Sequence, residues 1–76
     1  MLLRLPKIGM EMTEAVLASW LVEDGGTVTK GQPLYEMETD KVTNEIECPT
    51  PGRLRRIAQE GETYQVGDPV AEIVED

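Results

Sequence analysis

The chain carries DGGTVTKGQPLYE at residues 24–36 and repeats its pattern 36 residues later as EGETYQVGDPVAE at residues 60–72. With this shift, five of the sixteen positions from Glu23 to Glu38 are identical: two glycines, a threonine, a proline and a glutamate. Each copy consists of a glycine turn, a strand, a second glycine turn and a second strand. The duplication predicts two similar halves packed face to face, as a sandwich or flattened barrel with pseudo-two-fold symmetry.

The rest of the sequence is also typical of β-structure. Seven glycines and five prolines divide the 76 residues into short segments. These segments are rich in β-branched residues and alternate apolar and polar residues, whereas no window shows a helical stripe of more than two turns. The pattern predicts one all-β domain with strands at Leu2–Leu5, Ala15–Val22, Leu34–Thr39, Val42–Cys48, Arg53–Ala58 and Val70–Val74.

Length and composition exclude several classes of function. A chain of 76 residues supports one small domain. Its formal net charge of -8 gives no attraction to nucleic acid or to an anionic membrane. Without histidine and with one cysteine, we expect no metal site, no internal disulfide, no metal catalysis and no Ser-His hydrolysis. The first ten residues are too charged for a signal peptide and no long apolar stretch follows, which predicts a cytoplasmic or mitochondrial-matrix protein.

Only Asp40 and Lys41 separate two of the predicted strands, which predicts a tight two-residue hairpin although the turn lacks glycine. In this register successive side chains alternate between two faces. One face is mainly apolar and contains Tyr35, Met37, Thr39, Val42, Asn44 and Ile46. The other face is acidic and contains Leu34, Glu36, Glu38, Thr43, Glu45 and Glu47, with Leu34 opposite Glu47 and Glu36 opposite Glu45. The acidic face is either plain solvated surface or a surface that a partner reads.

Lys41 stands at the tip of this hairpin. An exposed lysine at such a place is ordinarily a surface charge that discourages edge-to-edge aggregation. Its sequence context is more specific, because Glu36-Met37-Glu38-Thr39-Asp40-Lys41-Val42 lies between the two glycine-bounded halves. This segment resembles the lipoyl domains of 2-oxo acid dehydrogenase complexes, whose lipoylated lysine sits in a Glu-Thr-Asp-Lys-Ala/Val hairpin.

The resemblance covers essentially all 76 residues. Two residues depart from the family's pattern: Ala15 stands where glycine is common, and Asn44 replaces a usual apolar residue. Both concern packing more than function. The segments that are similar to the family are the first strand and its loop at Leu5-Pro6-Lys7-Ile8-Gly9-Met10, Trp20 in the second strand, and the later turns at Pro51-Gly52-Arg53-Leu54 and Val66-Gly67-Asp68-Pro69.

The resemblance implies a single lipoyl carrier domain over residues 1–76, a flattened β-barrel of two four-stranded antiparallel sheets, forming the N-terminal part of a longer dihydrolipoamide acyltransferase chain. It implies lipoate joined by an amide bond to Lys41 by a lipoate ligase or lipoyl transferase. The implied partners are a thiamine-dependent 2-oxo acid decarboxylase that reductively acylates the lipoyl group, an acyltransferase core that passes the acyl group to coenzyme A, and dihydrolipoamide dehydrogenase. The domain itself is then a carrier and not an enzyme.

The residues around Lys41 are expected to be read by these partners. Glu38, Asp40 and Val42 flank it in the hairpin. The loop after the first strand lies beside the modified hairpin in related lipoyl domains, which suggests Gly9, Met10, Glu11 and Met12 as further contacts. For the two methionines, filling gaps against the core is an equal alternative.

Two alternatives remain. A biotinyl carrier domain of a carboxylase has a similar fold, but methionines normally flank its lysine, where this chain has Asp40 and Val42. A structural or adaptor β-domain, such as the lipoyl-like hairpin of membrane-fusion transport proteins, would leave Lys41 unmodified. Trp20 and Cys48 are expected to be core residues. The residues are equally compatible with a parent complex that uses pyruvate, oxoglutarate, a branched-chain acid or acetoin.

Overall fold

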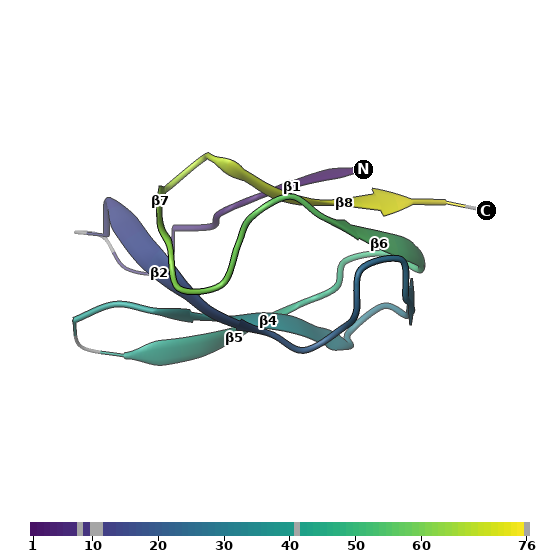
Figure 1. Cartoon of the computed structure of the whole chain (residues 1–76), viewed down its shortest axis with the longest axis horizontal. Coiled ribbons are helices and arrows are strands. Elements are labelled where there is room, and N and C mark those ends of the chain that lie inside the picture. The colour runs from purple at the N-terminus through teal and green to yellow at the C-terminus, as the bar shows by residue number, and fades with distance from the viewer. Residues whose placement is uncertain (8, 10–11, 41, 76) are drawn as a thin grey trace.

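The computed structural model describes residues 1–7, 9, 12–40 and 42–75. These residues form two antiparallel sheets of four strands, in the orders β1-β8-β6-β3 and β5-β4-β2-β7. The sheets lie one above the other (Figure 1). The all-β prediction is confirmed, and no helix among the described residues is long and apolar enough to cross a membrane. The strands are β1 (Leu2–Arg4), β2 (Glu14–Trp20), β3 (Thr27–Val28), β4 (Pro33–Glu38), β5 (Thr43–Glu47), β6 (Gly52–Arg56), β7 (Thr63–Gln65) and β8 (Pro69–Val74).

The two sheets are related by the predicted pseudo-two-fold symmetry. Each strand has a counterpart four strands later, so that β1, β2, β3 and β4 occupy the places of β5, β6, β7 and β8. Gly25 and Gly61 have φ angles of 84° and 83°, and Gly31 and Gly67 have φ angles of 87° and 95°. A residue with a Cβ rarely adopts such angles, which explains why glycine recurs at these four turns.

Two details differ from the sequence-based expectations. The strands β3 and β7 follow the first glycine turn of each repeat, where the repeat places a strand, but they are absent from the six ranges predicted from alternation because their two and three residues show too little of it. In the hairpin, Pro33 rather than Leu34 lies opposite Glu47, since the register shifts between Pro33 and Tyr35.

This bulge changes which way Leu34 faces. Leu34 and its neighbour Tyr35 are both buried, so the expectation that Leu34 lies on the acidic face is wrong. A β-bulge interrupts the alternation of side chains and allows two successive residues to enter the core. The same shift occurs between β1 and β8, where Val70 and Ala71 are both buried. The two halves therefore share this β-bulge as well as the regular pairing of their strands.

The buried core includes Trp20 and Tyr35. Their rings meet edge to face at a centroid distance of 5.3 Å, and the Trp20 indole N–H donates to the Ala58 carbonyl at 3.0 Å. Burial raises the pKa of Tyr35 to about 12. Cys48 is buried as predicted, and its thiol donates to the Thr50 carbonyl at 2.8 Å.

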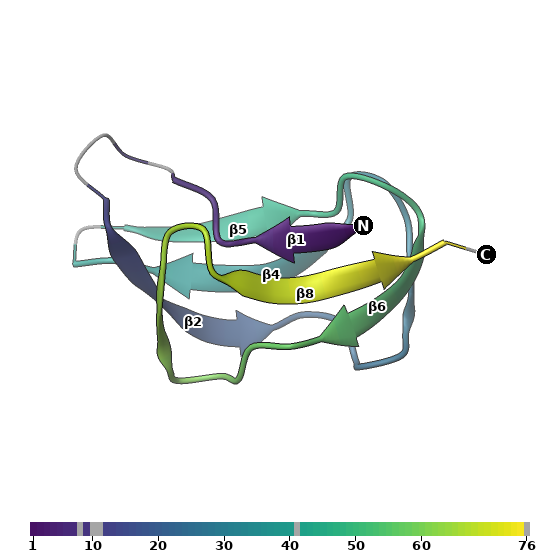
Figure 2. The same ribbon diagram turned by 90° about the horizontal axis from the view of Figure 1, so that it is seen from above.

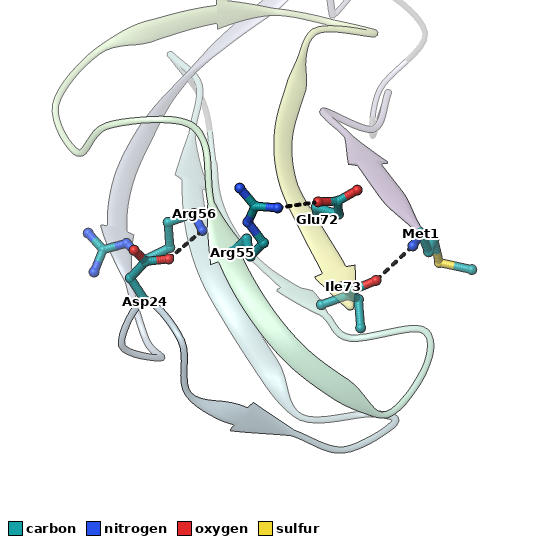
Figure 3. Close-up of polar contacts among 6 residues, drawn as sticks. All are labelled: Met1, Asp24, Arg55, Arg56, Glu72 and Ile73. Carbon is teal, nitrogen blue, oxygen red and sulfur yellow. Dashed lines mark hydrogen bonds and ion pairs between the residues drawn. The ribbon is translucent and has the colours of Figure 1, made fainter. Parts of the chain in front are cut away.

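A reciprocal pair of carboxylates connects the two halves. The backbone N–H of Arg56 donates to Asp24 Oδ1 at 2.8 Å (Figure 3), and the backbone N–H of Trp20 donates to Glu60 Oε2 at 2.7 Å. Asp24 and Glu60 are counterparts under the 36-residue shift, as are Trp20 and Arg56. The Arg56 guanidinium also lies over the Trp20 ring, 5.2 Å from its centroid. In each half, the carboxylate of the first glycine turn thus accepts the backbone N–H at the end of a strand of the other half, β6 for Asp24 and β2 for Glu60.

The chain ends lie at one end of the sandwich. The Met1 ammonium donates to the Ile73 carbonyl at 2.7 Å (Figure 3), and the Ile73 N–H donates to the Met1 carbonyl at 2.8 Å. The turn between β4 and β5 lies at the opposite end in both views (Figures 1 and 2). Under the pseudo-two-fold relation, the end of β8 and the start of β1 occupy the place of this turn, which explains the separation.

Candidate functional site: the turn between β4 and β5

Thr39 and Val42 close the turn between β4 and β5 through three hydrogen bonds. The Thr39 N–H donates to the Val42 carbonyl at 2.8 Å. The Thr39 hydroxyl oxygen accepts the Val42 N–H at 3.3 Å and donates to the Val42 carbonyl at 3.3 Å. A hydroxyl has one donor and two acceptor sites, so it serves both bonds at once. The sequence pattern predicts only that Thr39 lies on the mainly apolar face of the hairpin, and it does not indicate this role.

The backbone of the turn differs from the commonest two-residue hairpin loops. Type I′ and II′ turns require a positive φ at their first central residue, which here is Asp40. No described residue other than glycine has a positive φ, so Asp40 does not adopt either geometry. Asp40 therefore adopts a backbone conformation that does not require glycine. The Thr39 side chain contributes to closing the turn.

The described residues on either side of position 41 are open to solvent. Asp40 is exposed, and Val42 retains 51% of its accessible surface. Lys41 itself lies outside the described residues. Both flanks of position 41 are therefore accessible at this end of the domain.

The predicted acidic face is present on the outer side of this hairpin. Glu36 lies opposite Glu45 as expected, and Glu38 lies opposite Thr43. Glu38, Glu45 and Glu47 are exposed, whereas Glu36 is half-buried and accepts a bond from the Ser19 hydroxyl at 3.3 Å. On the inner side, the Nδ2 atom of Asn44 is buried without a hydrogen-bond partner.

The described residues between β1 and β2 lie toward the same end of the sandwich as the turn between β4 and β5 in both views (Figures 1 and 2). Gly9 is exposed, and its carbonyl accepts the Met12 N–H at 3.1 Å. Met12 is partly buried and packs against the core, which agrees with the gap-filling alternative for this residue. Met10 and Glu11 lie outside the described residues.

The described residues beside position 41 bear carboxylate and apolar side chains. Within residues 1–7, 9, 12–40 and 42–75, no group of three or more metal-ligating side chains is close enough to hold an ion. The neighbours of position 41 are the acidic Asp40 and the apolar Val42. Hydrogen bonds between Thr39 and Val42 close the turn that carries this position. This arrangement suits a lysine that carries a covalently attached group.

Comparison with known proteins supports this interpretation. The family model described as biotin-requiring enzyme, which covers biotin and lipoyl domains, matches residues 2–73. The lipoyl domain of the 2-oxoglutarate dehydrogenase complex from Azotobacter vinelandii shares the fold, with a TM-score of 0.80 at 23% identity, over 97% of this chain and 95% of that chain.

The curated relatives are larger proteins. The dihydrolipoyllysine-residue acetyltransferase component of the acetoin cleaving system from Cupriavidus necator is 43% identical over 63 residues, which are 82% of this chain and 17% of the relative. Component 2 of the mitochondrial pyruvate dehydrogenase complex from Arabidopsis thaliana, also a dihydrolipoyllysine-residue acetyltransferase, is 42% identical over 74 residues, which are 95% of this chain and 14% of the relative. The chain therefore spans less than a fifth of the length of these two relatives. Since the family model matches nearly the whole chain, the chain belongs to the biotin and lipoyl carrier-domain family.

Proposed function

We propose that the chain is a lipoyl carrier domain that receives lipoate on Lys41. The observation that carries the proposal is the turn closed by Thr39 and Val42 at the end of the fold, in which Asp40 and Val42, the neighbours of Lys41 in the sequence, are exposed. The names of the relatives support lipoate over biotin, because they are dihydrolipoyllysine-residue acyltransferases. Asp40 and Val42, in place of methionines, point the same way.

The chain contributes a nucleophile and a rigid support. In the attachment step, the Lys41 amine loses a proton and attacks the carbonyl carbon of a lipoyl adenylate, so that an amide bond forms and adenylate leaves. The amide removes the lysine charge. When attached, the lipoyl group supplies a disulfide that accepts an acyl group together with two electrons. The acidic face at Glu38 and Glu45 and the exposed Val42 orient the domain on its partners.

The proposal extends to the parent protein and its partners. Residues 1–76 form one carrier domain of a longer dihydrolipoamide acyltransferase chain, in keeping with the small fraction of each relative that the domain covers. A lipoate ligase or lipoyl transferase loads it, and a thiamine-dependent 2-oxo acid decarboxylase, the acyltransferase core and dihydrolipoamide dehydrogenase use it. The parent complex is then found in the bacterial or archaeal cytoplasm or in the mitochondrial matrix.

Intact-mass measurement after incubation with lipoate, ATP and a lipoate ligase tests the attachment site. We expect the wild-type chain to gain one lipoyl group, Lys41→Arg to gain none, and the control variants Lys7→Arg and Lys30→Arg to gain one each. Full modification of Lys41→Arg would refute the assignment of Lys41. A parallel reaction with biotin and a biotin ligase addresses the alternative, and efficient biotin attachment without lipoate attachment would favour a biotinyl carrier.

A second experiment tests whether the fold matters after attachment. The lipoylated domain and free lipoamide at equal concentration are incubated with a cognate decarboxylase and labelled 2-oxo acid. We expect the domain to be acylated much faster, because its surface orients the dithiolane at the active site of the decarboxylase. Equal rates would mean that the domain contributes no more than a lysine.

A further inference from the structure

We propose that Thr39 is a positioning residue for the modification of Lys41, acting through a hydroxyl clasp on Val42. The inference rests on the proposed function, because it concerns the reaction at Lys41. The clasp consists of the two bonds between the Thr39 hydroxyl and the backbone of Val42, each 3.3 Å long. Together with the 2.8 Å bond from the Thr39 N–H, it engages both backbone polar groups of Val42.

The clasp closes a turn whose backbone at Asp40 differs from the commonest hairpin loops. In a type I′ or II′ hairpin, a positive φ matches the twist of the loop to that of the strands, and this match stabilises the closed turn. Asp40 has no positive φ, so the match is absent here. The side-chain bonds of Thr39 provide closure that the backbone conformation alone does not favour.

Other turns of this domain are also closed by side chains. The Gln32 side-chain oxygen accepts the Thr29 N–H at 3.1 Å, and the Asp68 carboxylate accepts the Gln65 N–H at 2.9 Å. Both turns additionally contain a glycine with positive φ, at Gly31 and Gly67. The turn between β4 and β5 has no glycine, so its side-chain contact carries a larger share of the closure.

Asp40 and Lys41 are the only residues between the two clasped positions. When Thr39 and Val42 are held together, both ends of the segment that carries Lys41 are fixed, with only two residues between them. A ligase that must align the lysine amine with an activated carboxyl group then orders fewer backbone dihedrals at the moment of reaction. Loosening the clasp should therefore slow the chemical step more than it weakens the binding of the domain to the ligase.

The test compares three variants of the whole chain. Thr39→Val removes the hydroxyl and keeps the shape of the side chain, Thr39→Ser keeps the hydroxyl, and Thr43→Val makes the same chemical change at an exposed position on β5. Solvent exchange of the Val42 amide, measured by NMR, reports the clasp without any ligase. Ligase kinetics with lipoate report positioning, and circular dichroism confirms that each variant is folded.

We expect Thr39→Val to accelerate exchange of the Val42 amide by about tenfold and to lower kcat for lipoylation by about tenfold, with a smaller change in KM. Thr39→Ser and Thr43→Val should remain within about twofold of the wild type. If Thr39→Val does not fold, the comparison rests on Thr39→Ser with Thr39→Ala, of which only the alanine variant should lose activity.

Three outcomes would overturn the proposal. Unchanged exchange of the Val42 amide in Thr39→Val would show that the clasp does not hold the turn. Faster exchange with wild-type ligase kinetics would show that the clasp exists but does not position Lys41. A wild-type chain that gains no lipoyl group would refute the proposed function and the positioning role with it, while the exchange experiment would still decide whether the clasp forms.

Discussion

The two halves of the domain share five of sixteen residues in their repeated tract, yet they share most of the polar contacts at their turns. Gln32 and Asp68 are counterparts that each accept the N–H of the residue three positions earlier, although one is an amide and the other a carboxylate. Asp24 and Glu60 likewise accept equivalent N–H groups with side chains of different length. The hydrogen bond is retained while the residue that makes it changes, so sequence identity understates the structural similarity of the halves.

The outer faces of the two sheets have diverged in charge. On the β4–β5 side, Glu38, Glu45 and Glu47 are exposed. Their counterparts under the pseudo-two-fold relation are Val74, Leu2 and Arg4, and the adjacent strand β6 adds Arg53 and Arg55. Arg55 forms an ion pair with Glu72 at 3.3 Å, which Figure 3 shows on this face. The same scaffold thus presents an acidic surface on one side and an arginine-rich surface on the other.

The comparison shows that the core and turns follow the duplication, whereas the outer surfaces and the two ends do not. One end carries a closed turn with a candidate attachment site, and the equivalent place at the other end carries the chain termini. Features that the halves share are therefore expected to control stability. Features that distinguish them are expected to control recognition.

The largest effect on stability is expected at Gly52, where a neighbouring strand lies very close to the backbone. Gly52 pairs with Val28, and its counterpart Ala15 pairs with Tyr64. A Cβ on Gly52 would lie 2.5 Å from the Val74 carbonyl oxygen, at a φ of 156°. Gly52→Ala should therefore lower the free energy of unfolding by about 3 kcal/mol in urea denaturation.

The matched control for this prediction is Ala15→Gly. It should cost only about 1 kcal/mol, through the greater freedom of glycine in the unfolded chain. Equal, small losses for both variants would show that the two strands have the same spacing to their neighbours after all.

The second effect concerns the reciprocal carboxylates. The bond from the Trp20 N–H to Glu60 is partly buried, whereas the bond from the Arg56 N–H to Asp24 is exposed. Glu60→Ala should therefore reduce the free energy of unfolding by about 2 kcal/mol and Asp24→Ala by about 1 kcal/mol. Glu23→Ala changes an exposed neighbour and should stay within about 0.5 kcal/mol of the wild type. The opposite order of the first two losses would contradict the role of burial.

The smallest effect is expected from the charge of the two faces. If partners read the acidic face, reversing Glu38 and Glu45 to lysine should slow reductive acylation of the lipoylated domain about fivefold at low salt and less at high salt, since salt screens exposed charges. Reversing Arg53 and Arg55 to glutamate on the other face should leave the rate unchanged. Unchanged rates for both double variants at both salt concentrations would remove the electrostatic role of the acidic face.

Alternation and repeated glycines were enough to predict the fold class, the ranges of β1, β2, β4, β5, β6 and β8 to within a few residues and most of the hairpin register. They failed at Leu34, because a bulge is decided by how the two strands fit and leaves no mark on the local pattern. The repeat implied a strand at β3 and at β7, but alternation did not give their ranges, because these few residues form strands by pairing with β6 and β2. Lys41 is a candidate through its resemblance to a known hairpin, and its modification remains a prediction. The Thr39 clasp depends on a side-chain rotamer and a turn geometry that the sequence does not specify.

The paired ends of the chain have a mechanical consequence. Because Met1 and Ile73 exchange two hydrogen bonds at the edge of an antiparallel pair, pulling the termini apart loads these bonds first. The rupture then travels along β1 and β8 one bond at a time, as in unzipping, and requires little force at each step. The turn between β4 and β5 lies at the far end and bears no load until β1 has detached. Tension on the ends of the domain would therefore first separate β1 from β8, while the end that carries position 41 keeps its shape.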